Sequence, residues 1–447
     1  MSILKPHEYQ LRATQFILDK QRVYLAIDLG MGKTLISLMA IEKAQQPALV
    51  MGPLRTIIST WPDEIEKWTP HLSYYIMHGP DKNLDEAMKH DIILINYEGL
   101  PWLAKQSGRW RKRMVIYDEA SMIKSHSTQR FKLLQRMSMF WTNIRVLMSA
   151  TPAPNSLGDL WSQYYLLDAG EALGENITRF RENYCKTFSY PGMPVTLYNF
   201  DQRYTQEVYD KVSPMTFRLD AEDYLDMPEI SYNYIKCDLT PALMKKYREF
   251  EKSFVLDLLD SEIEVPNTAV LGMKLRMFIQ GGVYDKHHKW KHIHNIKLLR
   301  LQELIETAAG QPILCAIQFK GELAEIQKTL GDVPVIAGRT PVNLASQYVD
   351  QWNEGKIPIL LCHPASLAHG VNLQSGGHNL VYYSIPWSLE HYQQLNGRLH
   401  RQGQNHGVII NHLVMRNTID ETVVEALHKK DATQEDLLNH LKQHTEL

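Results

Sequence analysis

The sequence has few cysteines, and none stands in a pattern that binds metal or builds a disulfide framework. Its 447 residues include four cysteines that lie far apart without a CxxC pair: Cys185, Cys237, Cys315 and Cys362. This spacing argues against a disulfide-stabilised fold and against a zinc knuckle. Cys315 and Cys362 stand within apolar runs, so we expect both to be buried strand residues.

The sequence also lacks a visible signal peptide and any apolar run long enough to cross a bilayer. Lys and Arg number 48 against 50 Asp and Glu, so the formal net charge is −2 and no overall basic excess indicates a polyanionic partner. We therefore expect a protein of the reducing cytoplasm with no membrane partner, in which any surface for nucleic acid is local.

What the sequence does contain is two long regions in which short apolar runs alternate with amphipathic stretches. In residues 1–154, buried strands are predicted at 23–27, 48–51, 92–95, 114–117 and 146–148. In residues 295–447, strands are predicted at 313–317, 333–336, 359–362, 380–383 and 407–414, and a closing helix at 419–444. Such alternation is typical of parallel βαβ units.

The stretch between these regions lacks this alternation of strand-like and helical segments. Residues 155–235 are rich in aromatics and poor in strand-like runs, which favours a mostly helical insertion, and residues 236–294 continue as the helical start of the second region. Because 447 residues exceed one ordinary core, the predicted fold class is α/β, with two doubly wound parallel-sheet lobes and helical insertions.

A glycine-rich turn follows the first predicted strand and opens a helix, with the sequence Gly30-Met31-Gly32-Lys33-Thr34. Glycines let backbone N–H groups approach phosphates, and the helix N-terminus adds positive potential. In such a loop Lys33 would reach the β- and γ-phosphates of ATP and Thr34 would hold Mg²⁺. The strict phosphate-loop pattern has glycine where Ile27 stands, so this is a variant loop, and the alternative is a turn that binds nothing.

Two further strands end in polar residues. Asp118 and Glu119 follow the strand at 114–117, where ligands bind in parallel sheets. Asp118 is placed to hold Mg²⁺, and Glu119 to polarise the attacking water. Ser149 and Thr151 follow the strand at 146–148, and beside the other motifs we expect them to sense the γ-phosphate and couple hydrolysis to domain movement.

Arg398 and Arg401 lie three residues apart on or near one predicted helical face, so both can point at one anion. Arginine carries a permanent, planar charge suited to a phosphoryl transition state. A solvent-exposed basic helix is the usual outcome of such spacing, but the flanking Gln394 and Gln404 argue against it here.

These residues, in this order, resemble the superfamily-two helicases and, within them, the Snf (Swi/Snf-type) DNA translocases. Residues 394–404 match the QxxxRxHRxGQ signature of that family at all six defining positions, and the phosphate loop and acidic box match its first motifs. The segment 4–10 is similar to the glutamine motif, which implies that Gln10 reads adenine. By the same resemblance Gln394 belongs to the nucleotide site.

The resemblance implies two RecA-like lobes, the first holding ATP and Mg²⁺ and the second supplying Arg398 and Arg401 across the cleft. It implies ATP hydrolysis stimulated by double-stranded DNA, with largely sequence-independent contacts from Arg55, Asn96 and Ser366. The short inserts favour a compact bacterial or viral member, nucleoid-associated or in a host cytoplasm.

The chain departs from the family pattern at three places. One is the glycine-rich start of the motif before Gly370, which is replaced here by Ser366-Leu-Ala-His369. Ser121 stands where the acidic box usually ends in histidine, and Ser384 where an aspartate is frequent. Two alternative functions stay open. One is a strand-separating helicase on DNA or RNA, and the other is a nucleotide-gated DNA-binding module with weak hydrolysis, for which Ser121 is the only support in the sequence. Separately, the basic segment 109–113 is either a DNA-binding cluster or a solvated loop.

Overall fold

The computed structural model of the chain describes residues 5–106, 110, 113–138, 141, 143–188, 197–260, 266–285, 287–367 and 371–445. The chain divides into two compact units, one formed by Met1–Leu225 with Lys430–Leu447 and the other by Asp226–Lys429. The end of the segment that we assigned to the second lobe thus belongs to the first unit.

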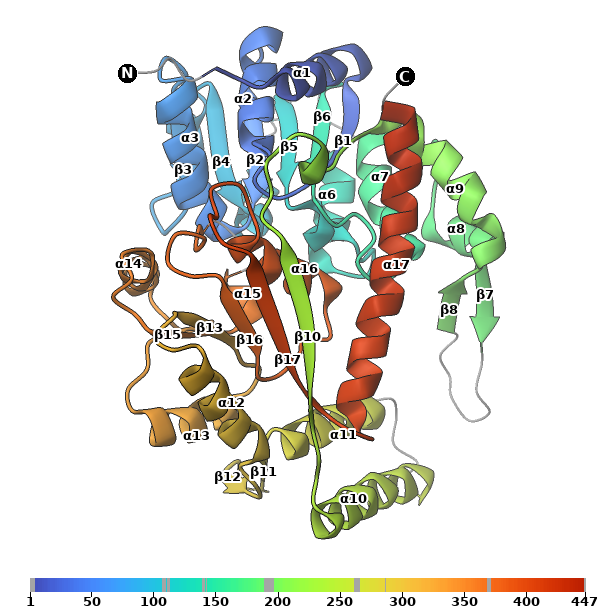
Figure 1. Cartoon of the computed structure of the whole chain (residues 1–447). Helices are drawn as coiled ribbons and strands as arrows, with labels where there is room; N and C mark the ends of the chain where they lie inside the picture. Colours follow the sequence, from blue (N-terminus) through green and yellow to red (C-terminus); the bar gives the residue numbers. More distant parts are fainter. Residues whose placement is uncertain are drawn as a thin grey trace. The chain divides into compact units, whose positions relative to one another are not determined.

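The first unit is built on a seven-stranded sheet in the order β3-β4-β2-β5-β6-β1-β9, in which all paired strands are parallel (Figure 1). Its strands are β1 (Arg22–Ile27), β2 (Ala48–Gly52), β3 (Tyr74–Met77), β4 (Ile92–Asn96), β5 (Met114–Asp118), β6 (Arg145–Met148) and β9 (Thr216–Leu219). The strands predicted in this region are confirmed, whereas β3 and β9 were not predicted.

β9 is a strand within the segment 155–235, for which a mostly helical insertion was predicted. It pairs with β1 in the register Ala26↔Arg218, although nearly two hundred residues separate the two strands in sequence. The insertion also holds an antiparallel hairpin of β7 (Cys185–Phe188) and β8 (Leu197–Phe200). An arginine in the middle of β9 hid the strand, because a buried charge interrupts the apolar pattern on which strand prediction depends.

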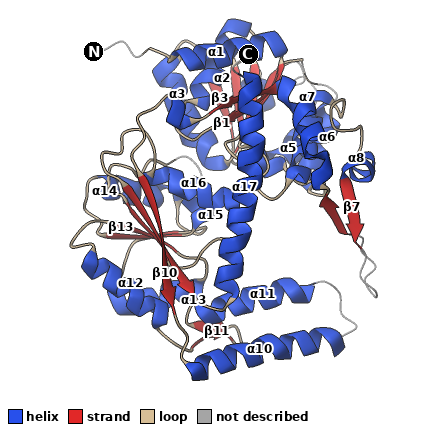
Figure 2. Cartoon of the chain, turned by 45° about the vertical axis from the view of Figure 1, so that its right-hand side comes forward, coloured by secondary structure: helices blue, strands red, loops and turns tan. Residues whose placement is uncertain are grey.

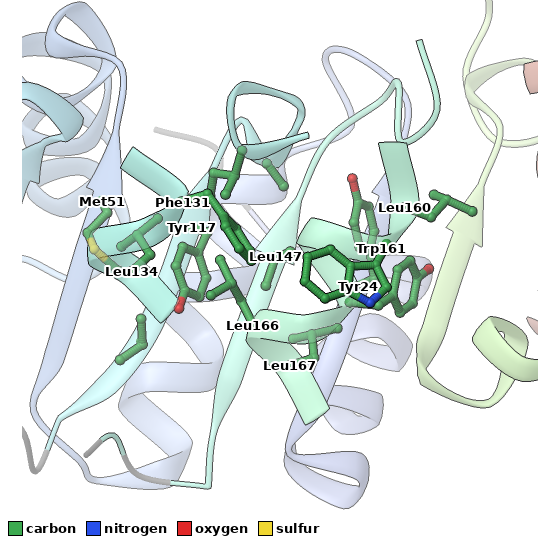
Figure 3. Close-up of a cluster of buried hydrophobic side chains, with 14 of the residues drawn as sticks. Tyr24, Met51, Tyr117, Phe131, Leu134, Leu147, Leu160, Trp161, Leu166 and Leu167 are labelled. Carbon is green, nitrogen blue, oxygen red and sulfur yellow. The ribbon is translucent and has the colours of Figure 1, made fainter. Parts of the chain in front are cut away.

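The helices before the second unit are α1 (Glu8–Lys20), α2 (Lys33–Ala44), α3 (Trp61–Trp68), α4 (Leu84–Ala87), α5 (Leu100–Leu103), α6 (Gln129–Ser138), α7 (Leu160–Asp168), α8 (Ile177–Tyr184) and α9 (Thr205–Val212). The core beneath them is rich in aromatics. Figure 3 shows Tyr24, Tyr117, Phe131 and Trp161 packed among leucines, and all four are buried. This packing fixes the strands whose carboxyl ends carry the candidate site.

The second unit is built on a six-stranded sheet, all parallel, in the order β10-β17-β16-β13-β15-β14. The strands are β10 (Ile230–Cys237), β13 (Ile313–Ala316), β14 (Val335–Ile336), β15 (Ile359–Cys362), β16 (Asn379–Tyr382) and β17 (Val408–Met415). The strands predicted here are confirmed, and β10 was not predicted. Cys315 and Cys362 are fully buried in β13 and β15, as expected.

Alternate residues of these strands face two separate cores, so helices lie on both faces of the sheet (Figure 2). Trp352 and Leu395 pack in one core and Leu301 and Ile326 in the other. The helices of this unit are α10 (Pro241–Asp260), α11 (Pro266–Ile279), α12 (Ile296–Thr307), α13 (Lys320–Leu330), α14 (Val342–Asn353), α15 (Pro364–Leu367) and α16 (Leu389–Leu399), with a small hairpin of β11 (Gly282–Tyr284) and β12 (Trp290–His292).

The last helix, α17 (Ile419–Thr445), begins in the second unit and ends in the first. Leu437 and Leu441 are fully buried in the core of the first unit, which explains why its C-terminal part belongs there. Within the described part of the chain, no helix combines the length and the apolar character needed to span a membrane.

Candidate functional site

The glycine-rich turn joins β1 to α2, the strand–loop–helix setting that a phosphate loop requires. Gly30 and Gly32 adopt φ angles of 83° and 76°, in the left-handed region that side chains disfavour. A Cβ on Gly32 would lie only 2.4 Å from Nε2 of Gln10. The backbone conformation therefore favours glycine at position 32, and a side chain there would force the end of Gln10 to move.

Gln10 lies against this loop, as expected for a residue of the same site. It is 5% exposed, its Nε2 donates to the carbonyl oxygen of Met31 at 3.2 Å, and its Oε1 accepts the backbone N–H of His7 at 2.9 Å. Met31 is fully buried beneath it. The structure brings Gln10 to the loop, and its role in reading adenine stays a prediction.

Lys33 opens α2, and its side chain reaches back to the end of β1. Its Nζ donates to the carbonyl oxygens of Ile27 at 2.8 Å and Asp28 at 3.0 Å. Burial lowers the pKa of Lys33, and the negative charges of Glu119, Asp28 and Asp118 oppose that shift. Nearby negative charge of this kind is expected where a phosphate loop meets an acidic box.

Asp118 ends β5 and is fixed by an aromatic neighbour. Its Oδ2 accepts the indole N–H of Trp61 at 3.0 Å, and its backbone carbonyl accepts the hydroxyl of Tyr97 at 2.8 Å. Burial and the adjacent charge of Glu119 raise the pKa of Asp118. A bound cation would offset both effects, so the carboxylate fits the predicted role of holding Mg²⁺.

Glu119 has an unusual backbone conformation, and its side chain accepts hydrogen bonds from two hydroxyl groups. Its φ of 58° lies in the left-handed region, which is uncommon for a residue with a side chain. Its Oε1 accepts hydrogen bonds from Ser121 at 3.0 Å and from Ser149 at 3.2 Å. Ser149 Oγ in turn accepts the backbone N–H of Thr151 at 3.1 Å. The two expected coupling residues are thus linked to the acidic box.

Sequence reasoning missed one pair of residues beside the loop. Arg218 of β9 is 5% exposed and donates to Oδ1 of Asp28 at 2.7 Å and to the carbonyl oxygen of Ala26 at 3.0 Å. No sequence motif marks this pair, because it forms only when β9 docks beside β1.

The expected DNA-contacting residues of the first unit have different environments. Arg55 is partly buried at the start of a π-helical turn (Thr56–Thr60), and burial lowers its pKa. Asn96 is only 5% exposed and donates to Oε2 of Glu98 at 2.9 Å, while Glu98 pairs with Arg130 at 3.2 Å. Asn96 therefore has an internal partner in this structure.

The candidate arginines of the second unit converge on one short segment. Arg398 is 8% exposed and donates to the carbonyl oxygen of Val371 at 3.0 Å, and Arg401 donates to Oδ1 of Asn372. α16 ends at Leu399, so Arg401 lies beyond the helix and the two arginines do not share a helical face. The structure nevertheless brings them together, and burial lowers the pKa of Arg401.

Other residues of the same signature have structural partners. Gln404 donates to the carbonyl oxygens of Gln374 and Gly377, each at 2.9 Å, and His400 Nε2 lies 2.8 Å from the carbonyl oxygen of Pro228. Gln394 is 1% exposed within α16. Part of the signature thus stabilises the second unit.

Ser366 lies in α15 and is half-buried, its backbone N–H donating to the carbonyl oxygen of His363 at 2.8 Å. Gly370, which belongs to the same predicted motif, lies outside the described residues.

The basic segment 109–113 is not an open cluster where the structure describes it. Trp110 is 2% exposed and Arg113 is 3% exposed. Arg113 donates to the carbonyl oxygens of Asp91 at 3.0 Å and Met88 at 3.2 Å. Arg109, Arg111 and Lys112 lie outside the described residues. Arg113 therefore serves the fold.

Comparison with known families and proteins agrees with this geometry. The family model described as SNF2-related domain matches residues 9–298, and the model described as helicase conserved C-terminal domain matches residues 296–403. The chain is 32% identical to putative protein p41 of Acyrthosiphon pisum secondary endosymbiont phage 1, an alignment that covers 99% of this chain and 100% of that protein.

Two other relatives are more distant. An uncharacterized ATP-dependent helicase of Mycoplasma genitalium is 24% identical over 91% of this chain, which spans 39% of that protein's length. A solved SWI2/SNF2 ATPase core of Sulfolobus solfataricus in complex with dsDNA is 22% identical, with a TM-score of 0.44 and coverage of 100% of this chain and 97% of that one.

Proposed function

Because this chain belongs to the SNF2-related family of helicase-like ATPases, we propose that it is an ATP-dependent translocase on double-stranded DNA. One observation supports the ATP site above all others. β1 and β5 both pair parallel with β6, so the phosphate loop that follows β1 and the acidic box at the end of β5 lie at the same edge of the first sheet.

The residues at this edge fit ATP with Mg²⁺. The backbone of Gly30–Lys33 would hold the phosphates, with Lys33 exchanging its carbonyl partners for phosphate oxygens, and Gln10 would face the adenine. Thr34 and Asp118 supply the hard oxygen ligands that Mg²⁺ prefers. The ion would neutralise charge on the phosphates during hydrolysis.

Glu119 is the residue that orients water in this proposal. Its Oε1 is held by the hydroxyls of Ser121 and Ser149, which restricts the direction in which the carboxylate accepts a proton from an attacking water. Ser149 Oγ also accepts the backbone N–H of Thr151, so a displacement of that segment would move the hydroxyl that holds the carboxylate of Glu119.

Arg398 and Arg401 complete the reaction in this proposal. When the two units close on ATP, the guanidinium groups would stabilise charge on the transferred phosphoryl group. To do so, Arg398 would release the carbonyl oxygen of Val371 and Arg401 would release Asn372, and both would bind phosphate oxygens instead. The conformation of the second unit would then depend on the bound nucleotide, which would tie hydrolysis to domain movement.

DNA is proposed to be contacted from both units through its backbone. Arg55 and Ser366 are the candidates whose side chains are partly accessible, whereas Asn96 must first release Glu98. Contacts with phosphates carry no sequence information and weaken with salt. Binding is therefore expected to be sequence-independent and to fall steeply between low and high salt.

ATP turnover measured with duplex DNA, single-stranded DNA and RNA tests the proposal. We expect duplex DNA to stimulate turnover most, and Lys33→Ala to abolish it. Displacement of a triplex-forming strand from intact duplex, without release of a strand from a fork, would support translocation. Strand release would indicate an unwinding helicase, and stimulation by RNA alone would overturn the assignment to DNA.

A further inference from the structure

The C-terminal end of α17 is connected to the phosphate loop by a chain of charged residues within the first unit. Lys442 lies on α17 and pairs with Oδ2 of Asp220 at 2.8 Å and with the carboxylate of Asp223. Asp220 pairs through its other oxygen with Arg218, and Arg218 pairs with Asp28 at 2.7 Å. Positive and negative side chains therefore alternate along this series of ion pairs, from Lys442 to Asp28.

The loop end of this chain touches the backbone that holds Lys33. Asp28 accepts Arg218 on Oδ1 and the backbone N–H of Ala221 on Oδ2 at 3.0 Å. Its backbone carbonyl accepts the Nζ of Lys33 at 3.0 Å. The orientation of that peptide group, and with it the position of the lysine, therefore depends on how firmly the Asp28 side chain is held.

Two carboxylates share one guanidinium at the centre of the chain. Arg218 is 5% exposed and serves both Asp28 and Asp220. Lys442 partly neutralises Asp220, so Asp220 attracts Arg218 less strongly and Arg218 binds Asp28 more firmly. Without the ammonium, Asp220 would compete for Arg218 more strongly and the hold on Asp28 would weaken.

We propose that Lys442 and Arg218 are positioning residues that set the phosphate loop, with Lys442 acting through Asp220 and Arg218 on Asp28. This inference rests on the proposed ATP site. It assigns to the end of the C-terminal helix an effect on nucleotide affinity, in addition to its packing in the core of the first unit. Arg218 itself is buried and serves the fold, so the test is placed on Lys442, which is 28% exposed.

The test compares full-length variants by titration with a fluorescent ATP analogue, by steady-state ATP turnover with saturating duplex DNA, and by thermal melting. Lys442→Met is expected to raise the dissociation constant and KM for ATP about fivefold, near the upper limit for one partly exposed ion pair, with little change in kcat. Lys442→Arg should restore most of the affinity, because it keeps the charge.

His440→Ala is the matched control on the same helix. His440 Nε2 lies 3.2 Å from Asp210 and its ring packs at 5.2 Å from Tyr209, so it anchors α17 without reaching Asp220. We expect this change to lower the melting temperature and to leave ATP affinity unaltered. An equal loss of affinity in His440→Ala and Lys442→Met would overturn the proposal, since attachment of the helix alone would then explain both.

A double variant keeps the test decisive if Lys442→Met folds poorly. Asp220→Asn combined with Lys442→Met removes both the competitor and its neutralising partner, so ATP affinity should return close to that of the unchanged protein. Persistent weak binding in a folded double variant would refute the competition. If the unchanged protein neither binds nor hydrolyses ATP, the proposed function fails and this inference fails with it. If it does both while Lys442→Met binds normally, the inference alone fails.

Discussion

The hydroxyl of Ser121 donates a hydrogen bond to Oε1 of Glu119 across 3.0 Å. This contact occurs where the family pattern has histidine at the end of the acidic box, and it shows that the serine keeps a connection to the carboxylate. Ser149 donates to the same oxygen from the end of β6. Two neutral hydroxyls therefore position the acidic box against the motif that follows β6.

Removing the first hydroxyl tests this link. Ser121→Ala should lower kcat about tenfold with KM for ATP nearly unchanged, because a hydrogen bond to a charged group contributes about 1.5 kcal/mol or more and Ser149 remains. Steady-state turnover measures it. Ser125→Ala is the control, since Ser125 bonds Ser127 at an exposed position. Unaltered kcat in Ser121→Ala would show that Ser149 suffices.

Arg401→Ala should nearly abolish turnover and preserve nucleotide affinity. An arginine that acts only on the transition state contributes on the order of 10³-fold or more in rate. Binding of a fluorescent ATP analogue and single-turnover hydrolysis separate the two effects. Asn372→Ala removes the partner of Arg401 inside the second unit and should cost far less. Lost ATP affinity with normal turnover in Arg401→Ala would refute the assignment.

Glu322 predicts a pH dependence of stability in the second unit. The carboxylate is fully buried and accepts hydrogen bonds from Gln318, Phe319 and Ser384, and burial raises its pKa from 4.5 to about 7. The folded protein therefore keeps a proton that the unfolded chain loses between those values. The contribution of Glu322 to the free energy of unfolding should fall as pH rises from about 4.5 to about 7, then level off.

Glu322→Gln mimics the protonated side chain and removes this dependence. Relative to the unchanged protein, its free energy of unfolding should rise across that pH range by on the order of 2–3 kcal/mol. Denaturant unfolding of both proteins at a series of pH values measures the difference. Glu306→Gln, at an exposed position of α12, is the matched control for the same chemical change at the surface. A constant difference for Glu322→Gln would contradict the prediction.

Gly32→Ala should weaken ATP binding at least tenfold and lower stability by about 1–2 kcal/mol. The new methyl group would meet Gln10 Nε2 at 2.4 Å in a backbone conformation that alanine disfavours. Nucleotide titration and thermal melting report the two losses.

Shortening Gln10 separates the contact from the backbone strain. In the double variant Gly32→Ala with Gln10→Ala, part of the stability should return, because the clash is gone and only the strain remains. Full recovery would show that the left-handed backbone costs little, and wild-type binding by Gly32→Ala would refute the preference for glycine.

The sequence by itself determined most strands of both sheets and the nature of the phosphate loop. These features are local: apolar runs mark β1 and β13, and a glycine turn that follows a strand marks the loop before Lys33. A run of residues that is apolar on both faces has few alternatives to a buried parallel strand. The parallel α/β character of both units followed from this alternation.

Only the tertiary structure decided which distant residues meet. β9 was missed because Arg218 interrupts its apolar run. The arginine is buried beside partners that include Ala26 of β1 and Asp28 just after it. Arg113 looked like a surface cation until carbonyl oxygens from neighbouring segments surrounded it. Likewise, the ion-pair partners of Lys442 are carboxylates that lie about two hundred residues earlier in the sequence. A buried charge is stable only beside its partners, and pairing between distant segments leaves no local pattern to read.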